Sequence, residues 1–140
     1  MRMLLDTCVI SETAKKSGLK HIRDRVARLS AKDTFLSVIT IGEITKGVKQ
    51  LDPSRKRTAL EGFLAQLEEN FEHRILDVGI ETAQIWGEIT AQARMRGKVI
   101  PPLDGIIAAT AIQHGLHVMT RNVKDFEESG VLLVNPWEDD

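Results

Sequence analysis

Four polar side chains from distant parts of the sequence are candidates for one chemical site: Asp6, Glu43, Asp104 and Asn122. Three carboxylates and an amide carbonyl offer oxygen ligands, which favour a hard cation such as Mg²⁺ or Mn²⁺. Without a cation, carboxylates held close together raise one another's pKa or repel one another. A divalent ion held this way can activate water for in-line attack on a phosphate. The residue types therefore predict metal-assisted hydrolysis of phosphodiester bonds.

The elements that must position these side chains follow from the apolar pattern. Short apolar runs predict strands at residues 3–5, 35–38, 75–76, 116–120 and 131–134. Helical spacing predicts helices near residues 19–29, 40–51, 54–67, 80–96 and 101–115, and a further helix that starts at Ser11. Strands that alternate with helices indicate an α/β fold with a parallel sheet flanked by helices. The crevice of such a sheet lies beyond the carboxyl ends of its strands, where all four side chains are expected.

Each acid also has a purely structural interpretation. Asp104 opens a nearly all-apolar helix, where a carboxylate can cap free backbone N–H groups and oppose the helix dipole. Thr40 and Glu43 have the spacing of a capping box. Asp6, at the end of a strand, is a common Asx-turn residue. Capping does not require these acids to share one rim, so their expected convergence favours the functional interpretation.

Composition narrows the class of protein. A chain of 140 residues is expected to form one domain over residues 1–140. The formal charge of −1 argues against a general DNA-coating protein but leaves room for a nuclease. The single cysteine, Cys8, excludes an internal disulfide framework, and no run reaches the roughly 18 apolar residues that span a bilayer. We therefore expect a cytoplasmic protein that does not bind a membrane.

Four segments together resemble the PIN-domain ribonucleases: Leu5-Asp6-Thr7, Thr40-x-x-Glu43, the run from Leu103-Asp104-Gly105 to Ala111, and Thr120-Arg121-Asn122-x-x-x-Phe126. Within that family the chain is most similar to VapC-type toxins of VapBC toxin–antitoxin systems. The final Asn135-Pro136-Trp137 resembles the FitB branch. The resemblance covers the whole chain in the right order.

The resemblance implies a PIN-like three-layer sandwich, with a central, mostly parallel sheet of about five strands. It implies Mg²⁺- or Mn²⁺-dependent endoribonuclease activity and a homodimer. It also implies inhibition by a VapB- or FitA-like antitoxin, through which the pair would assemble on operator DNA. Asp6, Glu43 and Asp104 match the family's metal-binding acids.

Two positions depart from the commoner family pattern. Asn122 stands where many members have Asp, and Cys8 stands where many have Asn or Ser. Asn122 can still offer a carbonyl oxygen or orient a water, but it brings no charge. Asp125, three residues on, could supply the missing carboxylate through water, or it could be an exposed loop acid. Thr7 and Thr120 are candidates to orient a ligand or water through their hydroxyl groups.

RNA affinity is expected to come from phosphate contacts, because aromatic residues make up only 4% of the chain. The candidate contacts are Arg94, Arg96, Lys98, Arg121 and Lys124. Another basic cluster, Arg55 to Arg57, opens a predicted helix, where positive charge opposes the helix dipole. These charges are candidates for a role other than helix stability.

Two other functions fit parts of the pattern. The missing fourth acid is compatible with an inactive PIN-fold module that acts through a DNA-binding partner. A phosphatase of the aspartyl-phosphate type also has Asp after its first strand. That chemistry usually needs a second Asp two residues further on, where this chain has Cys8.

Overall fold

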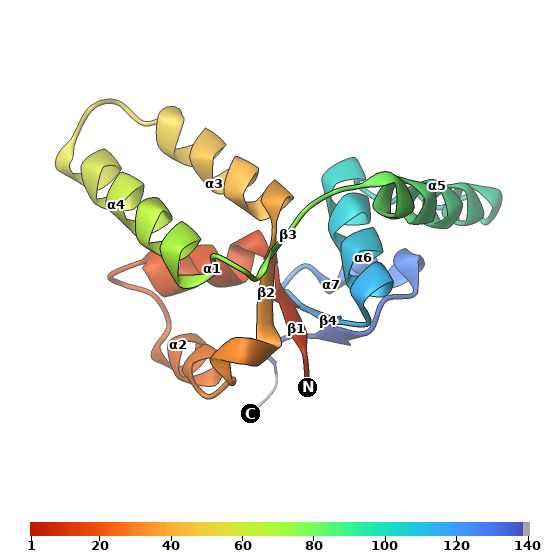
Figure 1. The fold of residues 1–140 in the computed structure, drawn as a ribbon, viewed down its shortest axis with the longest axis horizontal. Coiled ribbons are helices and arrows are strands. Elements are labelled where there is room, and N and C mark those ends of the chain that lie inside the picture. The colour runs from red at the N-terminus through yellow and green to blue at the C-terminus, as the bar shows by residue number, and fades with distance from the viewer. Residues whose placement is uncertain (139–140) are drawn as a thin grey trace.

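The computed structural model describes residues 1–138, which are arranged around a sheet of five parallel strands (Figure 1). The strands are β1 (Met3–Leu5), β2 (Thr34–Ser37), β3 (Ile75–Leu76), β4 (His117–Met119) and β5 (Leu133–Val134). Their order is β3-β2-β1-β4-β5, and every neighbouring pair is parallel. The expected α/β class and number of strands are confirmed.

Seven α-helices connect the strands: α1 (Thr7–Ala14), α2 (Lys20–Ala27), α3 (Val38–Lys49), α4 (Arg55–Asn70), α5 (Ile80–Met95), α6 (Pro102–His114) and α7 (Val123–Phe126). Figure 1 shows α3 and α4 as a hairpin on one side of the sheet and α5 beside α6 on the other. Within residues 1–138, no helix is long and apolar enough to cross a membrane.

The three-layer arrangement follows from the two-residue period of the strands. Met3 and Leu5 of β1 pack into one core cluster, with Val9 and Ile10 of α1. Leu4, whose side chain points the opposite way, packs into a second cluster with buried residues of α5 and α6. The sheet is therefore covered on both faces, as expected for the predicted sandwich.

Helix α6 is buried along most of its length, as its sequence predicts. Gly105 and residues 107–111 are all buried. A Cβ atom at Gly105 would lie 3.0 Å from two ring atoms of the Trp86 side chain. The missing side chain thus allows the first turn of α6 to lie directly against α5, which fixes the position of Asp104.

The strand order reverses direction next to β1. From β1 the chain proceeds outward to β2 and β3 on one side, and then to β4 and β5 on the other. At such a switch point the connections leave β1 and β4 in opposite directions and open a crevice beyond their carboxyl ends. Asp6 and Thr120 immediately follow these two strands.

Two predicted helix starts were wrong. Helix α1 begins at Thr7, directly after Asp6, rather than at Ser11. Helix α3 begins at Val38, because Ser37 leaves β2 with extended backbone and its side chain accepts a hydrogen bond from the Ile39 N–H at 3.0 Å. The capping box predicted for Thr40 and Glu43 therefore does not form, and both residues lie inside the helix.

The N-terminus of α6 also differs from the capping interpretation. Pro101 occupies the N-cap position and Pro102 the first helical position, so Asp104 lies within the first turn. The favourable position at the positive end of the helix dipole is retained. The four-residue helix α7, which begins directly after Asn122, was not predicted, and β5 is shorter than the predicted strand 131–134.

Candidate active site

Asp6 is the buried centre of the polar rim. It ends β1, and its Oδ1 accepts a hydrogen bond from the Thr7 N–H at 2.8 Å as the cap of α1. The Thr120 hydroxyl, at the end of β4, donates to Oδ2 at 2.8 Å. The thiol of Cys8 also contacts Oδ2, at 3.6 Å. Groups from both switch-point strands thus fix the Asp6 carboxylate in one orientation.

Glu43 is joined to this centre through Thr7. The Thr7 hydroxyl donates to Glu43 Oε1 at 2.6 Å, and it lies 3.2 Å from the Thr40 hydroxyl. Thr7 has one hydroxyl proton, and the shorter of its two contacts, the one to Glu43, is its main hydrogen bond. One α1 residue therefore orients the carboxylate of an α3 residue.

Asp104 shows that several acids converge on one place. Its pKa is raised to about 6 by desolvation, and then by the negative charges of Asp6, Asp125 and Glu43. The four carboxylates come from the start of α1, from α3, from α6 and from α7. Three of them were predicted as one site, and the structure brings those three together.

Asp125 contributes more to this convergence than sequence reasoning expected. The charge of Asp125 raises the pKa of Asp104 more than the charge of Glu43 raises it. The side chain lies in the first turn of α7, where the Asp125 N–H donates to the Asn122 carbonyl at 3.0 Å. Asn122 itself is exposed, and its backbone N–H donates to the Thr120 hydroxyl at 2.9 Å. Asn122 thereby supports the Thr120 bond to Asp6.

Cys8 contacts both Asp6, which follows β1, and the loop that follows β4. Its sulfur accepts a hydrogen bond from the Arg121 N–H at 3.4 Å and lies 3.6 Å from the Thr120 hydroxyl. Burial, followed by the charge of Asp6, raises the pKa of the thiol. Cys8 is therefore a neutral thiol at pH 7 and packs between α1 and the loop after β4.

The predicted RNA-contacting cations differ in their surroundings. Arg94, Lys98 and Lys124 are exposed. Arg96 donates to the Glu128 carbonyl at 3.0 Å and pairs with its carboxylate at 3.4 Å. Arg121 lies over the Trp137 ring, 5.4 Å from its centroid. Arg96 and Arg121 thus also have structural partners.

A groove of about 820 Å³ between α1, α3 and α4 adjoins the acids and was not predicted. Thr7 and Glu43 line it, together with half-buried apolar residues that include Ile44, Leu60 and Phe63. Four exposed cations also line it: Lys15, Lys16, Arg55 and Lys56. The sequence signals available for this groove were the apolar stripes of the predicted helices and the basic cluster at the start of α4.

The donor set fits a hard divalent ion. The charges of three other carboxylates act on Asp104, and all of them are negative, so a cation there would relieve their repulsion. Within residues 1–138, no three acidic, histidine or cysteine side chains are close enough to hold an ion by themselves. Carboxylate oxygens are ligands that Mg²⁺ and Mn²⁺ accept, and such an ion usually keeps several of its own waters.

Comparison with known protein families gives the same class of protein as the fold and the acidic site. The PIN domain model matches residues 3–130. The chain belongs to the PIN-domain family. Membership of this family excludes the alternative that the protein is an aspartyl-phosphate phosphatase.

Individual relatives extend over nearly the whole chain. Toxin FitB from Neisseria gonorrhoeae is 38% identical over 138 residues, which cover 98% of this chain and 99% of that protein. The tRNA(fMet)-specific endonuclease VapC from Salmonella typhimurium is 32% identical and covers 98% of both chains. The crystal structure of FitAcB from Neisseria gonorrhoeae matches with a TM-score of 0.93 and 37% identity, over 98% of this chain and 99% of that one.

Proposed function

We propose that this protein is the toxin of a type II toxin–antitoxin system, a metal-dependent endoribonuclease that hydrolyses RNA phosphodiester bonds. The observation that carries the proposal is the convergence of Asp6, Glu43 and Asp125 on Asp104, whose pKa is raised to about 6 by burial and then by these charges. A PIN fold and relatives named as VapC ribonuclease and toxin FitB support it. The alternative is an inactive PIN-fold module that acts through a partner.

Asp6, Glu43 and Asp104 would hold Mg²⁺ or Mn²⁺, and we assign the fourth acid to Asp125 rather than to Asn122. The support is that the Asp125 charge contributes to the raised pKa of Asp104, whereas Asn122 carries no charge; both residues are exposed. When bound, the ion would activate water and neutralise charge on the phosphate. Asn122 acts through its backbone, by holding the Thr120 hydroxyl toward Asp6.

Thr7 and Thr120 are positioning residues in this proposal. Each donates its hydroxyl proton to one carboxylate, Thr7 to Glu43 and Thr120 to Asp6. A carboxylate fixed by such hydrogen bonds presents its remaining lone pairs in a fixed direction. Arg94, Lys98, Arg121 and Lys124 remain the proposed phosphate contacts, and Arg96 is partly committed to Glu128.

The proposed partners follow from the relatives. Solved structures that match the chain include FitAB bound to a DNA fragment and DNA-bound VapBC from Salmonella typhimurium. We propose a cognate VapB- or FitA-like antitoxin that inhibits the site and carries the pair to operator DNA. A homodimer is proposed on the exposed apolar side chains Ile80, Met95 and Val99, which are 81%, 86% and 80% exposed. The proposed unit is one PIN domain, residues 1–140, that acts in the cytoplasm.

The proposal is tested by mapping cleavage sites on total RNA with purified wild-type protein and with Asp104→Asn. Wild-type protein should cleave RNA in Mg²⁺ or Mn²⁺, and EDTA should abolish cleavage. Asp104→Asn should lose more than about 100-fold, the upper range for disturbing even the outer partners of a metal ligand. Undiminished cleavage by the variant would refute the assigned site, whereas intact RNA with every metal would favour the inactive module.

A further inference from the structure

The groove between α1, α3 and α4 carries a net positive charge that ion pairs within the protein do not explain. None of the ion pairs between described residues involves Lys16, Arg55 or Lys56. Lys15 has only a pair with Glu12, at 3.6 Å. Glu43 is the one acid on the groove lining, and it lies at the end shared with the metal-site acids. The groove therefore presents a net positive surface beside a negative centre.

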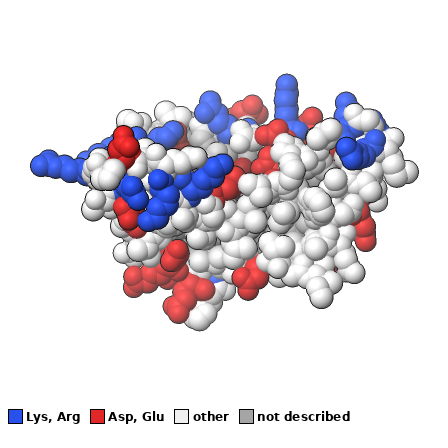
Figure 2. All heavy atoms as spheres, turned by 90° about the horizontal axis from the view of Figure 1, so that it is seen from above, with Lys and Arg blue, Asp and Glu red and all other residues white. Residues whose placement is uncertain are grey.

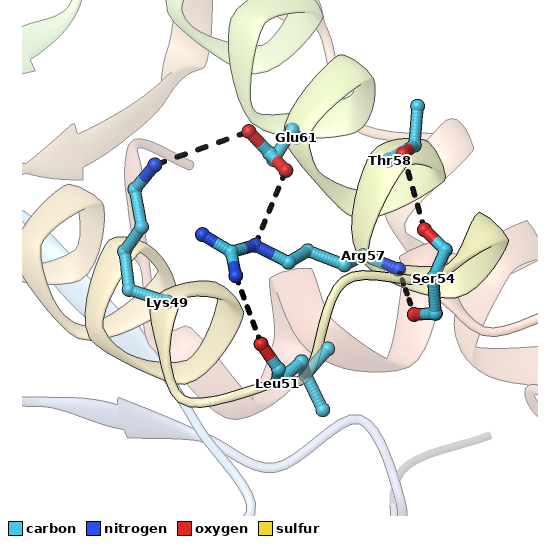
Figure 3. A network of polar contacts seen from close by, with 6 residues as sticks. All are labelled: Lys49, Leu51, Ser54, Arg57, Thr58 and Glu61. Carbon is cyan, nitrogen blue, oxygen red and sulfur yellow. Dashed lines mark hydrogen bonds and ion pairs between the residues drawn. The ribbon is translucent and has the colours of Figure 1, made fainter.

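The neighbouring cations of the same helices behave differently. Figure 3 shows Glu61 of α4 between Arg57 and Lys49, with N–O distances of 3.4 and 3.9 Å. Arg57 also donates to the Leu51 carbonyl at 3.0 Å. Arg57 and Lys49 thus share one carboxylate, whereas Arg55 and Lys56, which line the groove, take part in none of the ion pairs between described residues.

Arg55 and Lys56 also lie where positive charge does not stabilise the protein. They occupy the first turn of α4, at the positive end of its dipole, and that turn contains no acid. Ser54 caps the helix by accepting from the Arg57 N–H at 3.1 Å, so helix initiation does not need them. A stability argument thus leaves these two charges unexplained, and an anionic occupant of the groove would account for them.

Resting on the function proposed above, we propose that this groove holds the single-stranded RNA that leads away from the cleaved bond. Lys16, Arg55 and Lys56 bind its phosphates. The groove lining on α4 runs from Arg55 to Phe63, about 12 Å of helix, which spans a few nucleotides. The half-buried apolar residues Ile44, Leu60 and Phe63 offer a surface for the bases.

The location of the groove gives this path a direction. Thr7 and Glu43 line its inner end, and the same Glu43 carboxylate acts on Asp104. Figure 2 views the molecule from above, toward the carboxyl ends of the strands. It shows acidic side chains near the middle and lysine and arginine side chains on both sides of them. A strand can thus contact cations on each side while its scissile phosphate faces the acids.

The test compares two triple variants that remove the same charge. Lys16→Gln, Arg55→Gln and Lys56→Gln empty the groove of its unpaired cations. Lys20→Gln, Arg28→Gln and Lys32→Gln form the control, because these exposed cations lie outside the groove lining. Binding of a 5′-labelled RNA of about 20 nucleotides is measured by fluorescence anisotropy in the Asp104→Asn background, and KM for cleavage is measured in the otherwise wild-type chain.

The groove variant should bind this RNA at least about tenfold more weakly, and the slope of log K against log salt should fall by about 2 for three lost contacts. Its KM should rise more for the long RNA than for a trinucleotide, and the control variant should match wild type. Equal affinity of the groove variant, or an equal loss in the control, overturns the proposal. Unchanged RNA affinity with lost binding of an inhibitory protein would overturn it in favour of a protein-docking groove.

The anisotropy measurement keeps this inference separate from the proposed function. If wild-type protein cleaves no RNA with any metal, the nuclease proposal fails, but the two triple variants still decide whether the groove binds RNA. If wild-type protein cleaves and both triple variants bind RNA equally well, only the groove proposal fails.

Discussion

Replacing Asp104 by Asn should make the metal-free protein more stable at neutral pH while it removes activity. The pKa of Asp104 is raised from its usual 3.8 to about 6, and two units correspond to about 3 kcal/mol. Because the side chain is only half-buried, solvent screening reduces the expected gain to about 1–2 kcal/mol. For a chain of this size that gain raises the Tm by roughly 3–8 °C.

The pH dependence has a definite sign. A carboxyl group with a raised pKa binds its proton more tightly in the folded than in the unfolded state, so ionising it costs folding free energy. That cost is absent below pH 3.8, grows as the pH rises toward 6 and is constant above it. The stability advantage of the Asp104→Asn variant should therefore be full at pH 7.5 and nearly gone at pH 4.

The assay is thermal unfolding followed by circular dichroism in EDTA at both pH values. Asp77→Asn, at an exposed position, is the control and should change stability by less than about 0.5 kcal/mol. Added Mg²⁺ should raise the Tm of wild type more than that of Asp104→Asn. An Asp104→Asn variant no more stable than wild type at pH 7.5, or equally stabilised at pH 4, would refute the account of a half-buried Asp104 among like charges.

Three other changes test separate parts of the site. Asp125→Asn should reduce metal-dependent cleavage at least about tenfold. Asn122→Ala should reduce it less, because Asn122 supports Thr120 only through its backbone N–H, which the variant keeps. If the initial rates of the two variants fall in the reverse order, Asn122 is favoured as the fourth ligand. Thr7→Val should weaken Mg²⁺ affinity roughly 10–100-fold, and Thr7→Ser should restore it, as titrations of the two variants would show. Gly105→Ala should destabilise the fold by about 1–3 kcal/mol in urea unfolding, since its Cβ would lie 3.0 Å from Trp86; an unchanged midpoint would contradict that close packing.

The parts of the fold that sequence predicted best depend on strong, local patterns. The apolar runs that became β1 and β4 are buried on both faces, so their hydrophobicity was continuous and easy to recognise. The buried helix α6 between a proline pair and Gly115 was equally clear, because Gly115 adopts the left-handed conformation that ends it. The order in which polar residues follow these elements then placed Asp6 and Asp104 at one rim.

The errors have a common physical origin in competition between neighbouring residues. Ser37 and Thr40 are both good caps, and the choice depended on where β2 ends, which is set by its pairing with β3. Asp125 was ambiguous because the four-residue helix α7, which places its charge where it acts on Asp104, was not predicted. The basic cluster at the start of α4 was recognised, but the groove could not be placed, because it forms between three helices whose relative positions the sequence does not encode locally.

The bond between Thr120 and Asp6 has a consequence for synthesis of the protein. The two residues are 114 positions apart, so the Asp6 carboxylate gains its Thr120 partner only when β4 has joined β1. Ribosomes add about 5–20 residues per second, so β1 and α1 exist for several seconds before Thr120 has been made. No amino-terminal fragment that ends before β4 contains the complete set of donors and acids. Assembly of the site is therefore tied to completion of the chain, and a prematurely terminated product lacks it.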